Sequence, residues 1–288
     1  MDYGDILYAE ADGVARITIN RPEVMNAFRA QTCEELIDAF NRAGWNRETG
    51  VIVLTGAGDK AFCTGGDQGG HDDTEPGDAA ATGGYGGRGT IGLPIEALHD
   101  VIREVPQPVI ARVQGYAIGG GNVLATLCDL TIAGEGARFG QVGPKVGSVD
   151  PGFGTAYLAR VVGEKRAREM WYLCLRYSAE EAFAMGLVNA VVPDEELDAE
   201  VERWCRELLK RSPTALAIAK RSFNADSDSI RGIGRMGMQA LSLYYATPES
   251  REGGRAFREK REPAFREARE GSAKGEGKGE GKRGGGTG

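Results

Sequence analysis

The stretch Pro108-Val-Ile-Ala-Arg-Val-Gln-Gly-Tyr-Ala-Ile-Gly-Gly-Gly-Asn122 passes from an apolar, strand-like run into a glycine turn and then into the start of a helix. A second unit repeats this order, since Val51–Gly56 leads to the turn Thr64-Gly65-Gly66-Asp67. A glycine turn that opens a helix leaves backbone N–H groups without helical acceptors. Two such turns, brought together, would direct two N–H donors at one oxygen and form an oxyanion hole. Taken alone, either turn is better explained as purely structural.

Around these two units, strand and helix patterns alternate along the chain. Strands are predicted at residues 6–11, 14–19, 51–55, 109–113, 130–133 and 187–192, with a hairpin turn at Asp12-Gly13. Helical spacing marks residues 30–43, 154–161 and 165–176, and Ser178-Ala-Glu-Glu181 is a capping box that begins another helix. The alternation predicts an α/β fold with a sheet of mostly parallel strands.

The chain divides into three parts by composition. Residues 1–195 form the predicted α/β core, and residues 196–270 are almost entirely amphipathic helix, at 197–209, 213–224 and 232–245. Residues 271–288 contain mainly Gly, Lys and Glu and are predicted to be disordered. Within the core, the glycine-rich segment 69–92 is predicted to be an active-site lid, with Asp72, Tyr85 and Arg88 as its chemically useful side chains. A solvated arginine explains Arg88 equally well.

Composition narrows the class of protein. The 288 residues are 41% hydrophobic and carry a net charge of −7, which argues against a nucleic-acid-binding surface. The five cysteines are dispersed without a CxxC pair, as expected for reduced thiols in a cytoplasmic protein. No signal peptide and no membrane-spanning apolar run is predicted. His99 is expected to be a surface or packing residue, and His71 beside two aspartates is more simply a solvated loop residue than a metal ligand. No metal site is predicted.

Several motifs together resemble one family, the crotonase (enoyl-CoA hydratase/isomerase) superfamily. They are Ile19–Phe28, Lys60–Asp67, Val113–Asn122, Cys128–Leu130 and Phe139–Gln141, and the resemblance extends from the first strand to Phe265. It implies a ClpP-like spiral of ββα units with a C-terminal helical trimerisation region, and a homotrimer or homohexamer. It also implies an acyl-CoA substrate whose thioester oxygen is held by the backbone N–H groups of Gly66 and Gly120.

The residues at the family's two acid/base positions differ from those of its hydratases. The hydratases use two glutamates on a water molecule, and by resemblance the corresponding residues here are Val123 and Gly143. Neither can transfer a proton, so hydration of an enoyl-CoA is not expected.

A narrower resemblance lies in Gly140–Gly154 and Ala167–Cys174, which are similar to the 1,4-dihydroxy-2-naphthoyl-CoA synthases and the 2-ketocyclohexanecarboxyl-CoA hydrolases. Pro213–Asn224 and Leu243–Gly253 favour the hydrolases. This implies hydrolytic ring opening of a cyclic β-keto acyl-CoA, giving pimeloyl-CoA. The ring-closing synthase reaction is the alternative, followed by a generic hydratase or isomerase and by a non-catalytic CoA-binding scaffold.

The same resemblance implies three catalytic side chains. Asp150 matches the catalytic aspartate, although a helix N-cap also explains Asp-Pro-Gly before a helical run. Ser148 matches a serine that orients Asp150 or the substrate. Tyr245 matches a tyrosine that reaches the site from a subunit interface, and an ordinary aromatic residue beside Tyr244 is the alternative.

The remaining expectations concern the CoA thioester. By resemblance, Arg29, Lys60 and Ala61 lie near the nucleotide, and Lys260 contacts CoA across subunits. The predicted substrate-binding set also includes the following residues near the first glycine turn or in the lid: Gly65, Asp67, Gln68 and Tyr85. The space beside Gly143 is expected to hold the attacking water or bicarbonate. No permanently bound cofactor is expected.

Overall fold

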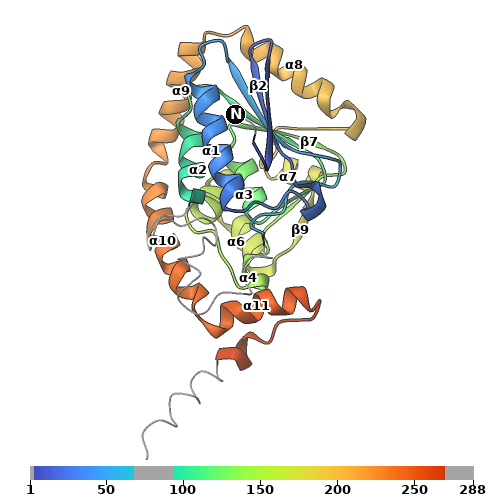
Figure 1. Ribbon diagram of the computed structural model, residues 1–288, viewed down its shortest axis with the longest axis vertical. Helices are drawn as coiled ribbons and strands as arrows, with labels where there is room; N and C mark the ends of the chain where they lie inside the picture. Colours follow the sequence, from blue (N-terminus) through green and yellow to red (C-terminus); the bar gives the residue numbers. More distant parts are fainter. Residues whose placement is uncertain (1–2, 68–93, 270–288) are drawn as a thin grey trace, which may run out of the picture.

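The computed structural model describes residues 3–67 and 94–269, in which two sheets are surrounded by helices (Figure 1). The larger sheet has the strand order β1-β2-β3-β5-β7-β10. Its strands are β1 (Ile6–Ala11), β2 (Val14–Ile19), β3 (Val51–Gly56), β5 (Val109–Val113), β7 (Leu130–Gly134) and β10 (Ala190–Val192). β1 and β2 are antiparallel, and the other neighbours are parallel. The predicted α/β class is confirmed.

A smaller sheet lies below the first and was not predicted as a sheet. It has the order β4-β6-β8-β9. Its strands are β4 (Ala61–Cys63), β6 (Tyr116–Ile118), β8 (Arg138–Gly140) and β9 (Arg176–Ser178). Three residues are too few to show a period-2 pattern, so the sequence gives no signal for them. β9 replaces the end of the helix predicted to reach Arg176, because Cys174 adopts a left-handed conformation (φ 52°) and the chain then pairs with β8.

The larger sheet is covered on both faces, which explains its continuous apolar strands. The helices α1 (Ala30–Trp45), α2 (Pro94–Glu104) and α3 (Gly120–Leu127) belong to the main core, which contains Phe40, Leu98 and Leu124. The opposite face packs on α8 (Leu197–Leu209) through a separate cluster that includes Val53, Ile132 and Val201. Figure 1 shows α8 across the sheet from α1 and α2.

Several shorter elements complete the core. They are the 3₁₀ turns η1 (Pro22–Val24) and η4 (Asp194–Glu196), α4 (Gly143–Val146), the π-helical turn η3 (Phe153–Tyr157), α5 (Leu158–Val162), α6 (Glu164–Leu173) and α7 (Ala179–Ala184). The predicted capping box starts α7, because Glu181 N donates to Ser178 Oγ at 3.2 Å and the Glu181 carboxylate accepts from Ser178 N at 2.8 Å. The hairpin turn is also confirmed, with positive φ at Asp12 (51°) and Gly13 (80°).

The predicted helical region continues with α9 (Pro213–Asp226) and α10 (Ser229–Tyr245), which run along one edge of the molecule, and with α11 (Pro248–Arg258), which lies across its lower end (Figure 1). Lys220 joins α9 to the core: its buried ammonium lies 2.7 Å from Asp129 Oδ2 and donates to the carbonyls of Ile102 and Gln107, each at 3.0 Å. No helix within residues 3–67 and 94–269 is long and apolar enough to cross a membrane. The predicted lid (69–92), with His71 and Arg88, and the predicted tail (271–288) lie outside the described residues.

Candidate active site

The two glycine turns lie against each other. β4 and β6 pair in parallel, so the turns that follow them leave the same edge of the smaller sheet. A Cβ on Gly121 would lie 1.9 Å from the Cys63 carbonyl oxygen, and one on Gly65 would lie 2.9 Å from Gly120 N. Both distances are shorter than a side chain tolerates, so glycine is required for the two backbones to approach this closely.

The backbone around Gly66 and Gly120 is oriented by its neighbours. Gly120 is the first residue of α3, so its N–H has no acceptor within the helix. Phe28 N donates to Gly65 O and Asp67 N donates to Phe28 O, both at 2.8 Å. These two bonds fix the backbone on either side of Gly66. Gly66 and Gly120 both line one cavity.

This cavity has a volume of about 120 Å³ and a largely apolar wall. Its apolar side chains come from distant parts of the chain, among them Phe28, Ile95, Trp171, Met238, Leu241 and Phe257. α11 contributes Phe257 to this wall and lies beside α4 at the lower end of the molecule in Figure 1, where Gly253 closely approaches Gly147. α10, predicted at residues 232–245, and α11, which was not predicted as a separate helix, therefore form part of the wall.

Asp150 is the acidic residue among the described residues of this wall. Only 14% of its side-chain surface is exposed, and Oδ1 has no hydrogen-bond partner in the described part of the chain. Burial raises the pKa of Asp150 to about 7, and a hydrogen bond with the backbone of Gly154 offsets part of this effect. The contact with Gly154 resembles the predicted N-cap, although the cap position of η3 is Gly152. A carboxyl with this pKa can accept a proton near neutral pH.

Ser148 and Tyr245 form a pair at the same cavity. Their oxygen atoms, Ser148 Oγ and Tyr245 Oη, lie 2.7 Å apart, and either can be the donor. Ser148 was expected to orient Asp150 or the substrate, and its observed partner is instead Tyr245. Tyr245 is the last residue of α10 and reaches the cavity of its own chain.

Residues 9–268 match the family described as Enoyl-CoA hydratase/isomerase. The chain belongs to this family. Similar solved structures include an enoyl-CoA hydratase from Mycobacterium avium subsp. paratuberculosis K-10, with 32% identity over 92% of this chain and 99% of the other and a TM-score of 0.80. Another is an enoyl-CoA hydratase from Bacillus anthracis (31% identity, 91% and 99% coverage, TM-score 0.70). A third is an enoyl-CoA hydratase/isomerase from Pseudoalteromonas atlantica T6c (25% identity, 91% and 100% coverage, TM-score 0.79).

The fold is therefore that of the crotonase superfamily, as expected, and the protein is a crotonase-type enzyme that acts on CoA thioesters. Val123 is buried in α3 immediately after the second glycine turn. A Cβ on Gly143 would lie 2.5 Å from the Ser148 carbonyl oxygen and 2.8 Å from the Trp171 ring. With this backbone, a glutamate at position 143 has no room.

Two cavity residues of this crotonase were missed as site residues. Gln141 is buried, and neither its Oε1 nor its Nε2 has a hydrogen-bond partner in the described part of the chain. Trp171 donates through Nε1 to the Gly154 carbonyl and so joins α6 to the turn that follows Asp150. Gln141 stands in the Phe-Gly-Gln motif, which was used only to recognise the family. A buried amide without a partner is costly, so a polar group in the cavity would stabilise it.

The expectation for His99 needs correction. It is not a surface residue, because its side chain is 2% exposed on the inner face of α2. It does pack, edge-on against Phe153 with a centroid distance of 5.7 Å, but its Nε2 also lies 4.0 Å from Asp150 Oδ2. The sequence of α2 did not show which face is buried, and Asp150 belongs to a segment about fifty residues further along the chain.

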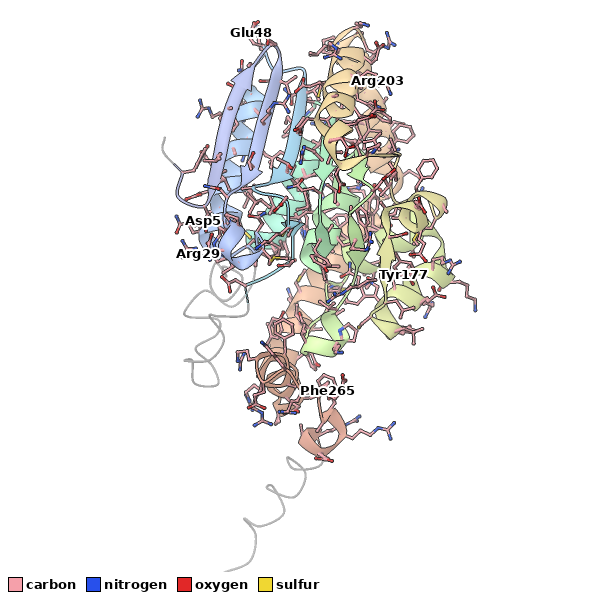
Figure 2. All side chains as sticks on the ribbon, turned by 90° about the vertical axis from the view of Figure 1, so that its right-hand side faces the viewer. Asp5, Arg29, Glu48, Tyr177, Arg203 and Phe265 are labelled. Carbon is pink, nitrogen blue, oxygen red and sulfur yellow. The ribbon has the colours of Figure 1, made fainter. Side chains whose placement is uncertain are left out.

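The residues predicted to bind CoA lie outside the described wall of the cavity, apart from Gly65 and Gly143. Arg29 is half exposed and bonds both oxygens of Asp5 at 2.8 Å, a pair visible in Figure 2. Ala61 is buried in β4, where its carbonyl accepts from Asn26 Nδ2 at 2.7 Å. Lys60 is exposed just before β4, and Lys260 is exposed with φ 54° just after α11.

Asp67 forms an ion pair with Arg21, Nη2 to Oδ2 at 2.9 Å, which stabilises the first glycine turn. Gln68 and Tyr85 lie outside the described residues. Among the residues that the structure covers, no group of three His, Cys, Asp or Glu side chains has the arrangement of a metal site.

Proposed function

We propose that this crotonase opens the ring of a cyclic β-keto acyl-CoA by hydrolysis, converting 2-ketocyclohexane-1-carboxyl-CoA and water to pimeloyl-CoA. The observation that carries the proposal is Asp150, a buried carboxyl with a pKa of about 7 in the cavity lined by both glycine turns. Val123 and Gly143 support it, because they stand where the family's hydratases have their two glutamates. The synthase-like and hydrolase-like segments identified in the sequence support carbon–carbon chemistry at this site.

In the proposed reaction, Asp150 acts as the general base. The ionised carboxylate takes a proton from water while the water oxygen attacks the ring ketone. The ketone oxygen becomes an alkoxide that can accept a hydrogen bond from Tyr245, whose hydroxyl is oriented by Ser148 at 2.7 Å. The apolar wall limits competing solvent and strengthens these interactions.

The alkoxide then collapses and the bond between the former ketone carbon and the α-carbon breaks. The electron pair of that bond passes to the α-carbon and the thioester carbonyl, which becomes an enolate. The N–H groups of Gly66 and Gly120 are the proposed donors to the enolate oxygen, which bears more negative charge than the thioester oxygen of the substrate. Protonation of the α-carbon, by protonated Asp150 or by Tyr245, gives the open-chain thioester, and the new carboxylic acid ionises.

The other expectations remain part of the proposal. Arg29, Lys60, Ala61 and Lys260 would contact CoA outside the cavity. Beside Gly143, the Gln141 amide offers a polar partner for the attacking water or, alternatively, for bicarbonate. We also propose a cytoplasmic homotrimer or homohexamer assembled through residues 196–270, with residues 1–195 as the CoA-thioester core.

Isotope labelling provides the direct test. The enzyme is incubated with 2-ketocyclohexane-1-carboxyl-CoA in H₂¹⁸O, and the products are analysed by mass spectrometry. Ring hydrolysis predicts pimeloyl-CoA with one ¹⁸O in its new carboxyl group. Free CoA with intact ring acid would instead indicate thioester cleavage and contradict the proposal.

Two further substrates separate the alternatives. Cyclisation of succinylbenzoyl-CoA without ring opening would establish the synthase reaction, and hydration of crotonyl-CoA would establish a hydratase like those named among the similar structures. No turnover of any of the three, with CoA binding intact, would indicate a scaffold.

A further inference from the structure

The geometry points to His99 as the positioning residue of the Asp150 base: its Nε2–H faces the carboxylate and holds it for proton transfer. This rests on the proposed function in so far as Asp150 acts as the base. No sequence pattern suggested it, because His99 and Asp150 belong to different segments. The structure brings His99 Nε2 to 4.0 Å from Asp150 Oδ2.

Both groups are incompletely satisfied. Within the described residues, His99 Nε2 and Asp150 Oδ1 have no hydrogen-bond partners, although both atoms are buried. Buried polar atoms without partners are costly, so a rearrangement that pairs these groups is favoured. The present separation is about 1 Å longer than an ordinary N–H···O bond. Catalytic hydrogen bonds of ligand-free enzymes are often long and shorten when substrate binds.

The imidazole is also held by an aromatic neighbour. The ring of Phe153 packs on it edge-to-face, at 90°. The Arg103 guanidinium lies 5.2 Å from the centroid of Phe153 and is itself anchored by Ser227 Oγ at 2.7 Å. His99 therefore packs against a ring that is itself held by a hydrogen-bonded arginine, as expected of a side chain that orients another.

His99 and Asp150 pair as an uncharged imidazole and a carboxylate, not as two opposite charges. Burial lowers the pKa of His99 to about 3, so the imidazole is uncharged throughout the working range. A neutral imidazole protonated on Nε2 donates to the ionised form of Asp150 and favours it. The charged side chains near His99, apart from Asp150, are Glu96, Asp100 and Arg103 of α2 and Arg231 and Arg235 of α10. Asp100 pairs with both arginines of α10, at 3.2 and 3.3 Å, so these charges largely offset one another.

The test compares His99→Leu, which has no donor, with His99→Gln, which retains an amide N–H. Without the donor, the ionised form of Asp150 is less stable, so its pKa rises. We expect the acidic limb of the kcat profile to move up by about one pH unit in His99→Leu, with a roughly five-fold loss at pH 7 and little change in KM. His99→Gln should return the limb to within about half a unit of the original. His99→Met provides a second apolar variant if His99→Leu does not fold.

A readout independent of turnover is the titration of the Asp150 carboxyl by ¹³C NMR in aspartate-labelled protein, assigned with Asp150→Asn. The same upward shift in His99→Leu and His99→Met, reversed in His99→Gln, supports the positioning role. An unchanged titration in the apolar variants, or equal shifts in all three, would show that His99 only fills space. If the unmodified enzyme opens no ring, the proposed function fails, and this titration still decides the role of His99.

Discussion

At the scale of single residues, the burial of Asp150 suits its carboxyl to proton transfer near neutral pH but lowers the stability of the folded state once the carboxyl is ionised. Its carboxyl is nearly enclosed by apolar groups, and the pKa of about 7 measures how strongly this environment disfavours the charge. A base of this kind works best just above its pKa. The same property therefore determines the pH dependence of both catalysis and stability.

For catalysis, we expect kcat/KM to rise with pH up to about 7 and then level off, because the ionised Asp150 is the active form. Asp150→Asn should reduce kcat by roughly 10²–10⁴-fold, the usual contribution of a general base, while leaving the dissociation constant of CoA unchanged. Steady-state kinetics from pH 5 to 9 and calorimetric CoA titration measure both. Full activity of Asp150→Asn would exclude Asp150 as the base.

Asp150 makes the unfolding free energy fall as the pH rises, whereas a carboxylate that is stabilised by a salt bridge makes it rise. The pKa of Asp150 is raised from 3.8 to about 7 on folding, so the folded state binds more protons between these values. This contribution is fully present below about pH 4 and is lost as the pH rises through 7. Relative to Asp150→Asn, the unmodified protein should lose roughly 3–4 kcal/mol of unfolding free energy between pH 4 and 8.

Urea denaturation at several pH values measures this difference. The matched control is Asp59→Asn, since Asp59 is exposed just before β4 and should leave the pH dependence unchanged. If the unfolding free energies of Asp150→Asn and the unmodified protein change in parallel with pH, the pKa of the Asp150 carboxyl is not raised in the folded state.

Tyr245 offers a second residue-scale comparison, because its neighbour Tyr244 is half-buried on the same helix and lies outside the described cavity wall. Tyr245→Phe removes the hydroxyl that pairs with Ser148, and we expect kcat to fall by roughly 10–100-fold with a small change in KM. Tyr244→Phe should retain nearly full activity. Equal losses in the two variants would indicate damage to α10 rather than to the chemistry.

At the scale of elements, the close contact between α4 and α11 closes the cavity. A Cβ on Gly253 would lie 2.3 Å from Gly147 N, whereas a Cβ on Gly254 would meet only the mobile end of Arg258, at 3.4 Å. Gly253→Ala should cost about 1–3 kcal/mol by overpacking and should lower activity, because Phe257 of α11 lines the cavity. Gly254→Ala should be neutral or stabilise by up to about 1 kcal/mol.

Thermal unfolding with parallel activity assays distinguishes these two variants. They differ by one position on the same helix, so a shared loss of stability would show that the helix, and not the contact with Gly147, is responsible.

The elements also show how much could be predicted from the sequence. Amphipathic helices such as α1 and α8 were found because their buried residues recur at helical spacing, and the start of α7 was found because its capping box is local in sequence. The smaller sheet was missed because the pairing of its three-residue strands depends on residues far away in the chain, whereas the three-residue β10 was found within a longer apolar run. The same distinction applies to the site. The glycine turns and Asp150 were identified from local motifs. The contact of Asp150 with His99 and that of Ser148 with Tyr245 depend on tertiary packing, which no local pattern shows.

At the scale of the whole molecule, α9 and α10 present large apolar side chains to solvent. Phe223 is 77% exposed on α9, and Met236 and Leu243 are 76% and 75% exposed on α10. These positions suit the trimer or hexamer that we propose, since an exposed apolar patch of this kind commonly marks an interface.

Replacing Met236 and Leu243 together by glutamate should lower the molecular mass measured by analytical ultracentrifugation, because charge is disfavoured at an apolar interface. Trp45→Glu is the control, as Trp45 is 84% exposed at the end of α1, on a different helix. A monomeric unmodified protein at micromolar concentration would contradict the proposed assembly.

The position of Tyr245 and Phe257 in the cavity wall has a consequence for biosynthesis. Every strand of both sheets, and both glycine turns, precede residue 193 and leave the ribosome before these two aromatic side chains are added. A nascent chain can therefore form most of its hydrophobic core and both glycine turns before α10 adds Ile230, Met238 and Leu241. The cavity wall is complete only when α10 and α11 dock, which separates the folding of the sheets from the time at which a substrate can first be enclosed.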